Sequence, residues 1–260
     1  MKRLLAVLAV VALCGVSFTA NAATLIGHWG FEEGTGNTVY DSSGNLLNGT
    51  ISGATYTTGK VGSYALNFNG SSNFVEVGYS ALLNPATVSI SLWFKPNGTQ
   101  AESADILDKG HGSGTIPYFG GYVFQYNYNS GSIDTVYGNG SGFPGLNTGG
   151  DYRDGVWHHI VATLGEAGIA LYVDNTLINS VPGQGAIEAN HSDLYFGRHG
   201  TLGRFFNGAI DDVQIYDGAL TAGQVSNLYN TGTVVPAPAA ILLLGPGLVG
   251  LAAARRRFLK

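Results

Sequence analysis

Residues 208–229, GAIDDVQIYDGALTAGQVSNLY, combine a strand, a turn and a short helix near the C-terminal end of the chain. In the first half, Val213 and Ile215 alternate with polar residues, which is the period-two pattern of a strand with two different faces. Strict alternation places Asp211 on the apolar face with Val213. A carboxylate on such a face is costly to bury unless it is hydrogen-bonded, paired or bound to a cation. We therefore expect Asp211 to have a specific partner.

The second half of this stretch predicts a short helix. Thr221 followed three residues later by Gln224 is a capping box, in which each side chain bonds the other residue's backbone N–H. Val225 and Leu228 then form a short apolar stripe. We expect this helix to cover a sheet that the preceding strands form.

The rest of the chain consists of short alternating segments separated by glycine, which contributes 40 of the 260 residues. Residues 88–94 alternate most clearly, and residues 169–173 repeat the pattern before a tight turn at Asp174 and Asn175 into residues 176–180. Further strands are predicted at residues 24–31, 64–68, 74–77, 121–128, 156–163, 193–197 and 205–216. Many short strands with turn residues between them predict two packed antiparallel sheets in one domain.

Five stretches, in order along the chain, resemble bacterial laminin-G-like, concanavalin A-like jelly-roll domains. They are GHWGFEE from Gly27 with DSSGN from Asp41, GKVGSYALNFNGSSNFVEV from Gly59, SISLWFKP from Ser89, WHHIVATL from Trp157 with LYVDN from Leu171, and residues 208–229. The resemblance covers most of residues 24–230. It implies an all-β, two-sheet antiparallel jelly-roll sandwich with a short C-terminal helix. The fold alone does not imply one activity.

The first 22 residues are typical of a secretory signal peptide. A basic start precedes an apolar core, and residues 20–22, Ala-Asn-Ala, form a small-x-small cleavage site. The chain's one cysteine, Cys14, lies in that core. A lipid-modified Cys14 is the alternative, but Leu13 stands where a lipoprotein signal has a small residue. Cleavage after Ala22 leaves no cysteine, so neither disulfides nor thiolate chemistry operates in the mature chain.

The C-terminal end has a second apolar segment. Residues 237–254 are 18 uncharged, mostly apolar residues, and three arginines follow them. At about 1.5 Å per residue they nearly span the ~30 Å hydrocarbon layer, with the basic end cytoplasmic. This end resembles the PEP-CTERM sorting signals of Gram-negative bacteria, with Val-Pro-Ala-Pro at residues 235–238 in place of the usual Pro-Glu-Pro. A permanent transmembrane anchor is the alternative. The predicted parts are therefore a signal peptide (1–22), a laminin-G-like jelly-roll domain (23–233) and a sorting signal or transmembrane segment (234–260).

The acidic charge is concentrated in the predicted domain. All 17 Asp and Glu lie within residues 23–233, whereas 6 of the 12 Lys and Arg lie in the two end segments. The domain therefore carries 6 basic and 17 acidic residues, a net charge of −11. An acidic surface repels phosphate backbones, so we expect no nucleic-acid partner. It favours bound cations instead.

Familiar catalytic motifs are missing from the sequence. Glycanases of the concanavalin A-like fold carry two or three carboxylates on one strand face in Glu-x-Asp-x-x-Glu spacing, whereas Glu32 and Glu33 are adjacent and point to opposite sides. There is no Gly-x-Ser-x-Gly elbow, His-Glu-x-x-His or P-loop. His158 and His159 are consecutive strand residues and cannot chelate one ion. We therefore predict a non-enzymatic protein, unless a constellation is assembled only in three dimensions.

Calcium is the predicted cofactor, as a structural ion with about 6–8 oxygen ligands. Asp41 and Asn45 offer side-chain oxygens in one tight turn, and the resemblance implies that this turn lies beside the strand that carries Asp211. Glu33 and the backbone carbonyls near residues 59–62 complete the predicted shell. The alternative is that Asp41 closes an Asx-turn while Asp211 accepts backbone N–H bonds.

The predicted strand at residues 121–128 is the candidate ligand surface. Tyr122, Tyr126 and Tyr128 share one face, and Gln125 and Asn127 share the other. Tyrosine rings stack on sugar rings, and amides bond sugar hydroxyls, so these five residues predict a glycan-binding surface. The alternative is that the tyrosine row belongs to the core and the amide row is ordinary surface.

These predictions favour an exported, carbohydrate-binding protein at the cell surface or in the extracellular matrix of a Gram-negative bacterium. Its expected partners are extracellular polysaccharide or a surface glycan, and the membrane through the C-terminal segment before processing. Loops at residues 118–121 and 138–151 are expected to rim the binding surface. The alternatives are a structural or adhesive envelope protein without a sugar site and, less favoured, a polysaccharide hydrolase, which needs two acids in an open cleft.

Overall fold

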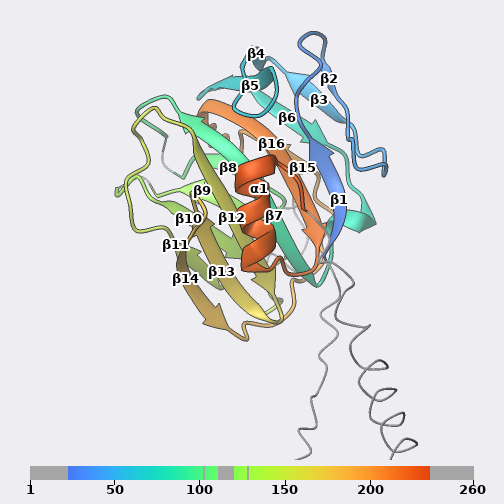
Figure 1. The fold of residues 1–260 in the computed structure, drawn as a ribbon, viewed down its shortest axis with the longest axis vertical. Coiled ribbons are helices and arrows are strands. Elements are labelled where there is room, and N and C mark those ends of the chain that lie inside the picture. Colours follow the sequence, from blue (N-terminus) through green and yellow to red (C-terminus); the bar gives the residue numbers. More distant parts are fainter. Residues whose placement is uncertain (1–22, 102, 111–119, 128, 235–260) are drawn as a thin grey trace, which may run out of the picture.

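The computed structural model describes residues 23–101, 103–110, 120–127 and 129–234 (Figure 1). These residues form two antiparallel sheets packed face to face, with one α-helix on the outside. The predicted all-β jelly-roll sandwich is confirmed. The predicted signal peptide and most of residues 234–260 lie outside the described residues.

Sheet A has eight strands, and its central strands carry the helix. Its order is β14 (Thr176–Pro182), β13 (Gly168–Val173), β12 (His158–Gly165), β7 (Thr87–Pro96), β16 (Asn207–Asp217), β5 (Tyr64–Asn69) and β4 (Thr55–Thr58), and β1 (Thr24–Trp29) also pairs with β16. All these pairings are antiparallel.

Sheet B also has eight strands. Its order is β11 (Gly145–Asn147), β10 (Ile133–Tyr137), β9 (Tyr122–Tyr126), β8 (Asp105–Asp108), β15 (Leu194–Phe196), β6 (Phe74–Val77), β3 (Gly49–Ser52) and β2 (Thr38–Val39). A 3-10 turn, η1 (Ala81–Leu83), precedes β7, and the helix α1 (Ala222–Thr231) follows β16.

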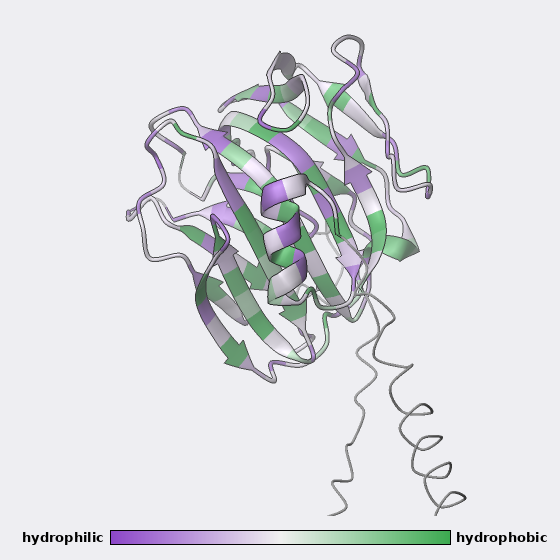
Figure 2. Ribbon diagram, viewed as in Figure 1, coloured by the Kyte–Doolittle hydropathy of each residue, from purple (hydrophilic) through white to green (hydrophobic). Residues whose placement is uncertain are grey.

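The core lies between the two sheets. Ile90, Leu92 and Phe94 of β7 are completely buried there, together with Phe124 of β9 and Phe196 of β15. Figure 2 shows the alternation of hydrophobic and hydrophilic residues along the strands that makes this packing possible. Each such side chain contributes roughly 1.5–3 kcal/mol by leaving water. The period-two pattern of residues 88–94 therefore predicted its buried face correctly.

A β-bulge interrupts the alternation in β16. Ile210 and Val213 both lie in the core, so the two residues between them face the other side of the sheet. The register with β7 shifts between Asp211 and Gln214, and Asp212 has a φ of 47°. The prediction that Asp211 shares the apolar face of Val213 is therefore wrong, because strict alternation does not hold across a bulge.

The helix α1 covers the outer face of sheet A (Figure 1). The predicted capping box is confirmed, because the Thr221 side chain and the Gln224 side chain each accept the other residue's backbone N–H. Val225 and Leu228 pack against Val161 in a second small apolar cluster. The helix therefore shields one face of the sheet from water.

The first and last described residues lie close together. Thr24 of β1 pairs with Asp217 of β16, and Ala23 and Val234 pack against the same apolar cluster. In the described part of the chain, no helix is both long enough and apolar enough to span a membrane. The predicted span at residues 237–254 lies outside that part.

Candidate functional site

The outer face of sheet B has a pocket of about 250 Å³ over β9 and β10. Val123 and Gln125 of β9 and Val136 of β10 form its floor, with Val136 directly opposite Val123 across the strands. Phe143, which precedes β11, and Arg204, which precedes β16, line its sides. We call this site the sheet-B pocket.

Glycines form the rim of the sheet-B pocket. Gly110, Gly120, Gly121 and Gly138 all line it. Gly121 has a φ of +82°, and a Cβ there would lie 2.1 Å from the carbonyl oxygen of Lys109. Only glycine fits that position, and the bare rim lets a ligand approach the backbone. Three of these glycines come from the two loops that were expected to rim a binding surface.

The tyrosine row of β9 faces the core instead of a ligand. Tyr122 and Tyr126 are each 1% exposed. The Tyr122 hydroxyl donates to Leu83 O at 3.3 Å, and the Tyr126 ring stacks on Phe206 with ring centroids 6.0 Å apart. Buried rings cannot stack on a sugar, so the prediction for these two residues is wrong, and the alternative that the tyrosine row belongs to the core holds for them. Tyr128 lies outside the described residues.

The amide row of β9 lies on the side of the pocket. Gln125 lines the pocket and lies opposite Asp105 of β8 and Asp134 of β10 in the sheet register. Asn127 instead stabilises the turn after β9, where its Oδ1 accepts the N–H of Asn129 at 3.2 Å. Of the predicted amide pair, Gln125 is therefore the one that faces the pocket.

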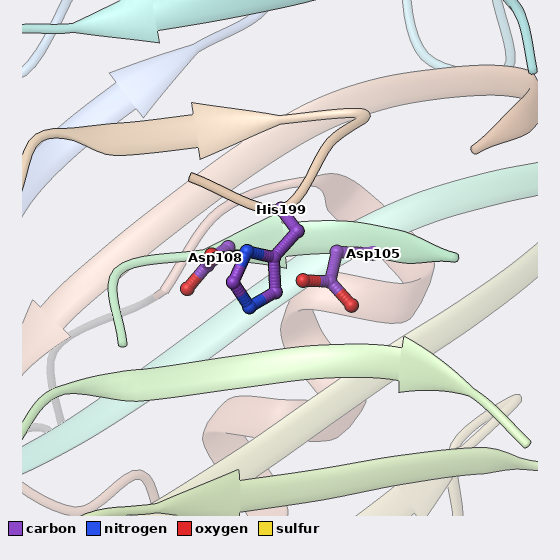
Figure 3. Close-up of side chains that lie close together, drawn as sticks. All are labelled: Asp105, Asp108 and His199. Carbon is purple, nitrogen blue, oxygen red and sulfur yellow. Dashed lines mark ion pairs between the residues drawn. The ribbon is translucent and has the colours of Figure 1, made fainter. Parts of the chain in front are cut away.

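Three titratable side chains meet where the β15–β16 connection crosses β8. Asp105, Asp108 and His199 place ligand atoms within 4.8 Å of one another, and Figure 3 shows the His199 ring between the two carboxylates. The register of β8 with β9 shifts between Asp105 and Leu107. This bulge places two acids that are three residues apart on one face, which simple alternation does not predict.

This cluster is held by backbone N–H groups. Asp108 Oδ1 accepts from Gly110 N at 2.6 Å, and its Oδ2 accepts from Gly200 N at 2.7 Å. His199 Nδ1 accepts from Thr201 N at 3.0 Å. The Asp108 carboxylate and His199 Nδ1 are therefore engaged by backbone donors. The contacts fasten the β15–β16 connection to β8.

Asp105 is the most enclosed member of the cluster. Its side chain is fully buried, and neither carboxyl oxygen has a hydrogen-bond partner. Burial, and then the Asp108 carboxylate, raise the pKa of Asp105 well above its usual value. The pair Asp105 and Asp108 does not line an open cleft, which a glycoside hydrolase of either stereochemistry requires.

Asp41 closes the first loop of the domain. Its oxygens accept the backbone N–H groups of His28 at 2.9 Å, Ser43 at 2.9 Å and Leu47 at 3.0 Å, together with the Ser43 hydroxyl at 2.8 Å. Burial acts to raise the pKa of Asp41, but these bonds outweigh it and hold the pKa below its usual value. The carboxylate is thus saturated by protein donors.

Asp211 is held in a similar way by a different loop. Its Oδ2 accepts the N–H groups of Lys60 at 2.7 Å and Val61 at 2.9 Å, while its buried Oδ1 has no hydrogen-bond partner. Burial raises the pKa of Asp211 to about 7. The two backbone bonds to Oδ2 are those that the alternative predicted for Asp211.

The four residues predicted to bind calcium do not fit a common ion. Glu33 accepts the Tyr40 N–H at 2.7 Å, and the Asn45 Nδ2 donates to the backbone carbonyl of Ile26 at 3.1 Å. Within the described residues, Glu33, Asp41 and Asp211 do not come within ligand distance as a group of three. The donor set matches the alternative of a closed turn and backbone bonds.

The chain is similar in sequence and in fold to several known proteins. A zebrafish (Danio rerio) protein, adhesion G-protein coupled receptor V1, is 26% identical over 152 residues, which are 56% of this chain and 2% of that protein. The chain thus spans only a small part of the curated relative that it matches.

Solved structures with the same fold include domain 4 of AbnA, a GH43 extracellular arabinanase from Geobacillus stearothermophilus, in complex with arabinotriose. It has a TM-score of 0.65 and 22% identity over 80% of this chain and 99% of that one. The binding domain of Paraclostridial Mosquitocidal Protein 1 has a TM-score of 0.66 and 18% identity over 80% of this chain and 52% of that one. Residues 69–226 match the family model described as the concanavalin A-like lectin/glucanases superfamily, and the chain belongs to this family.

Proposed function

We propose that this protein is an exported, non-enzymatic glycan-binding protein and that the sheet-B pocket is its binding site. The lining of the pocket supports the proposal, because apolar Val123, Val136 and Phe143 line it together with polar Gln125 and Arg204. A sugar ring has apolar C–H faces and hydroxyl edges, so a mixed lining of this kind suits it. The Phe143 side chain is 50% exposed.

The family and the sequence support this proposal from two sides. The family is lectin-like, and one solved neighbour contains arabinotriose. The predicted signal peptide extends the proposal to extracellular polysaccharide or a surface glycan as the ligand, and to the cell surface or extracellular matrix of a Gram-negative bacterium as the location. Contact with the membrane through the C-terminal segment, before processing, belongs to the same proposal.

A glycan array probed with the purified protein tests the proposal. Gln125→Ala and Phe143→Ala are expected to weaken binding at least about tenfold, because each removes a contact that orients the sugar. Tyr40→Ala is the matched control, because Tyr40 is an exposed aromatic residue outside the pocket. Melting temperatures within about 2 °C of wild type must accompany the result. Binding that is absent, or unchanged in both pocket variants, contradicts the proposal.

A second candidate function, adhesion to proteins without a sugar site, is favoured by β14. This strand is an edge of sheet A, its residues Thr176–Pro182 are uncharged, and Leu177 and Ile178 are exposed. Such an edge offers unpaired backbone groups to another strand. Leu177→Lys should then reduce adhesion to envelope proteins while glycan binding stays unchanged. Adhesion that survives this substitution contradicts the second candidate.

A further inference from the structure

Arg204 is the cationic side chain of the sheet-B pocket. Its backbone is fixed, because its carbonyl oxygen accepts the N–H groups of Asp105 and His199, each at 3.2 Å. Its side chain lines the pocket together with Gln125 and Phe143. The fold therefore fixes the backbone from which the Arg204 side chain extends beside the pocket.

The guanidinium of Arg204 differs from those of the other arginines in the described residues. Arg153 pairs with Asp151, with Nη2 and Oδ2 2.7 Å apart. Arg198 donates to a backbone carbonyl at 2.9 Å and lies over the Phe74 ring. Within residues 23–101, 103–110, 120–127 and 129–234, the Arg204 side chain forms no hydrogen bond or ion pair. Its five N–H donors are left for solvent or a ligand.

The neighbouring acid, Asp105, forms no hydrogen bond with Arg204. Asp105 lies close enough to Arg204 for the two to interact electrostatically, and the guanidinium acts to lower the pKa of Asp105. Burial and the Asp108 carboxylate act in the opposite direction and prevail, so the pKa of Asp105 lies well above its usual value. Neither carboxyl oxygen of Asp105 has a hydrogen-bond partner, so Asp105 does not engage the N–H donors of Arg204.

The domain carries 17 acidic and only 6 basic residues. The overall field disfavours anions in general, so an anionic ligand needs a specific local contact. A guanidinium group supplies one, because its planar fork matches the two oxygens of a carboxylate. The pocket of about 250 Å³ is smaller than the roughly 300–1,000 Å³ of drug-sized ligand sites, which suits one sugar residue at a time.

We propose that the sheet-B pocket binds the carboxylate of an acidic sugar residue through Arg204, so that the ligand is a uronate-containing polysaccharide. This proposal rests on the proposed glycan-binding function and adds the charge of the ligand to it. Gln125 then contacts the hydroxyl groups of the same sugar residue, and Phe143 contacts its ring.

Calorimetric titration of the full protein with matched oligosaccharides tests the proposal. The probes are tetrasaccharides of galacturonate, mannuronate and glucuronate-containing chains, each paired with its methyl ester, which keeps the shape and removes the charge. At least one free acid is expected to bind about tenfold or more tightly than its ester. That preference should shrink as the salt concentration rises, because salt screens a partly exposed ion pair.

Protein variants test the same contact from the other side. Arg204→Gln is expected to remove the preference for the free acid, and Arg204→Lys to restore only part of it, because lysine lacks the bidentate fork. Arg153→Gln is the control, because Arg153 is paired on the surface outside the pocket. Circular dichroism and melting temperature show whether each variant folds.

The outcomes separate this proposal from the proposed function. Neutral sugars or esters that bind as tightly as the acids overturn the role of Arg204 and leave glycan binding in place. A sulfated tetrasaccharide that binds as tightly as every uronate overturns the assignment of a carboxylate. No binding of any saccharide overturns both proposals.

Discussion

The imidazole of His28 lies against the carboxylate of Asp212, with Nε2 and Oδ1 2.7 Å apart. This contact joins β1 to the bulge of β16. The other ring nitrogen, Nδ1, lies 2.8 Å from the hydroxyl oxygen of Ser42 in the first loop. Both carboxylate oxygens of Asp212 also accept hydrogen bonds from Gln214 Nε2, each at 3.0 Å. The His28 side chain therefore links β1 to the first loop and to the bulge of β16, and we call these contacts of His28, Ser42 and Asp212 the His28 clasp.

We expect His28→Ala to destabilise the domain by roughly 1–3 kcal/mol, because it leaves the nearly buried Asp212 carboxylate without its imidazole partner. Urea unfolding followed by fluorescence measures the change. His191→Ala is a matched control, because His191 is exposed and stacks on Tyr79 at the surface. If the free energy of unfolding falls no more in His28→Ala than in His191→Ala, the His28 clasp contributes nothing to stability.

Ser42, His28 and Asp212 are linked in the order of a nucleophilic catalytic triad. We predict that they do not catalyse a reaction. The backbone N–H of Ser43, next to Ser42, bonds Asp41 Oδ1 at 2.9 Å, so it is not free to stabilise an oxyanion. The Ser42 hydroxyl also has a second acceptor, His28 O, at 3.2 Å. Ser42 should therefore remain unlabelled by a fluorophosphonate probe, as detected by peptide mass spectrometry.

We also predict that the protein does not hydrolyse polysaccharides, because the carboxyl groups of Asp105 and Asp108 are buried. The purified protein should release no reducing ends from a panel of β-glucans, galactans and uronate polymers. Activity that disappears in Asp105→Asn or in Asp108→Asn would make the protein a hydrolase. An esterase or acyl-transfer activity that disappears in Ser42→Ala would instead show that Ser42, His28 and Asp212 are catalytic.

The fold was predictable because its main signals are local. Alternation at residues 88–94 and the capping box of Thr221 and Gln224 depend only on neighbouring residues, and both are confirmed. The two histidines at 158 and 159 face opposite sides as expected: His158 bonds Asp174, and His159 bonds Ser91. Short strands such as β2, β8 and β11 were missed, because two to four residues carry too little periodicity.

The candidate site was less predictable, because bulges and packing between sheets determine it. Alternation cannot distinguish a row of tyrosines in the core from a row at a ligand surface, and Tyr126 lies in the core. Bulges placed Asp105 beside Asp108 and moved Asp211 off the apolar face. Arg204 lies in a loop without any motif, so its place in the pocket depends on the way that loop crosses β8.

Removal of calcium is expected to leave the stability unchanged. A structural site at a hundred times its Kd contributes about 2.7 kcal/mol, which shifts the melting temperature of a domain of this size by several degrees. Asp41 is saturated by protein donors, so we expect EDTA, with metal removal verified by elemental analysis, to shift the melting temperature by less than about 1 °C. A larger drop that Asp41→Asn abolishes would restore the calcium interpretation.

Asp211 is expected to make the domain less stable as the pH rises. Burial raises its pKa to about 7 in the folded state, whereas an unfolded aspartate has a pKa of 3.8. Between these values the folded chain binds the extra proton, so the contribution of Asp211 is fully present below about pH 4 and is lost as the pH rises through about 7. A difference of this size corresponds to at most roughly 4 kcal/mol.

Asp211→Asn removes the titration while its side-chain oxygen still accepts the N–H groups of Lys60 and Val61. The free energy of unfolding of this variant, relative to wild type, should therefore rise by on the order of 1–4 kcal/mol between pH 4 and pH 8. Asp217→Asn, at the exposed end of the same strand, is the control and should show no such rise. Urea unfolding at each pH measures both variants. A difference that is flat across this range for Asp211→Asn would mean that Asp211 is already ionised at pH 4, with its buried Oδ1 stabilised by a partner such as a bound cation.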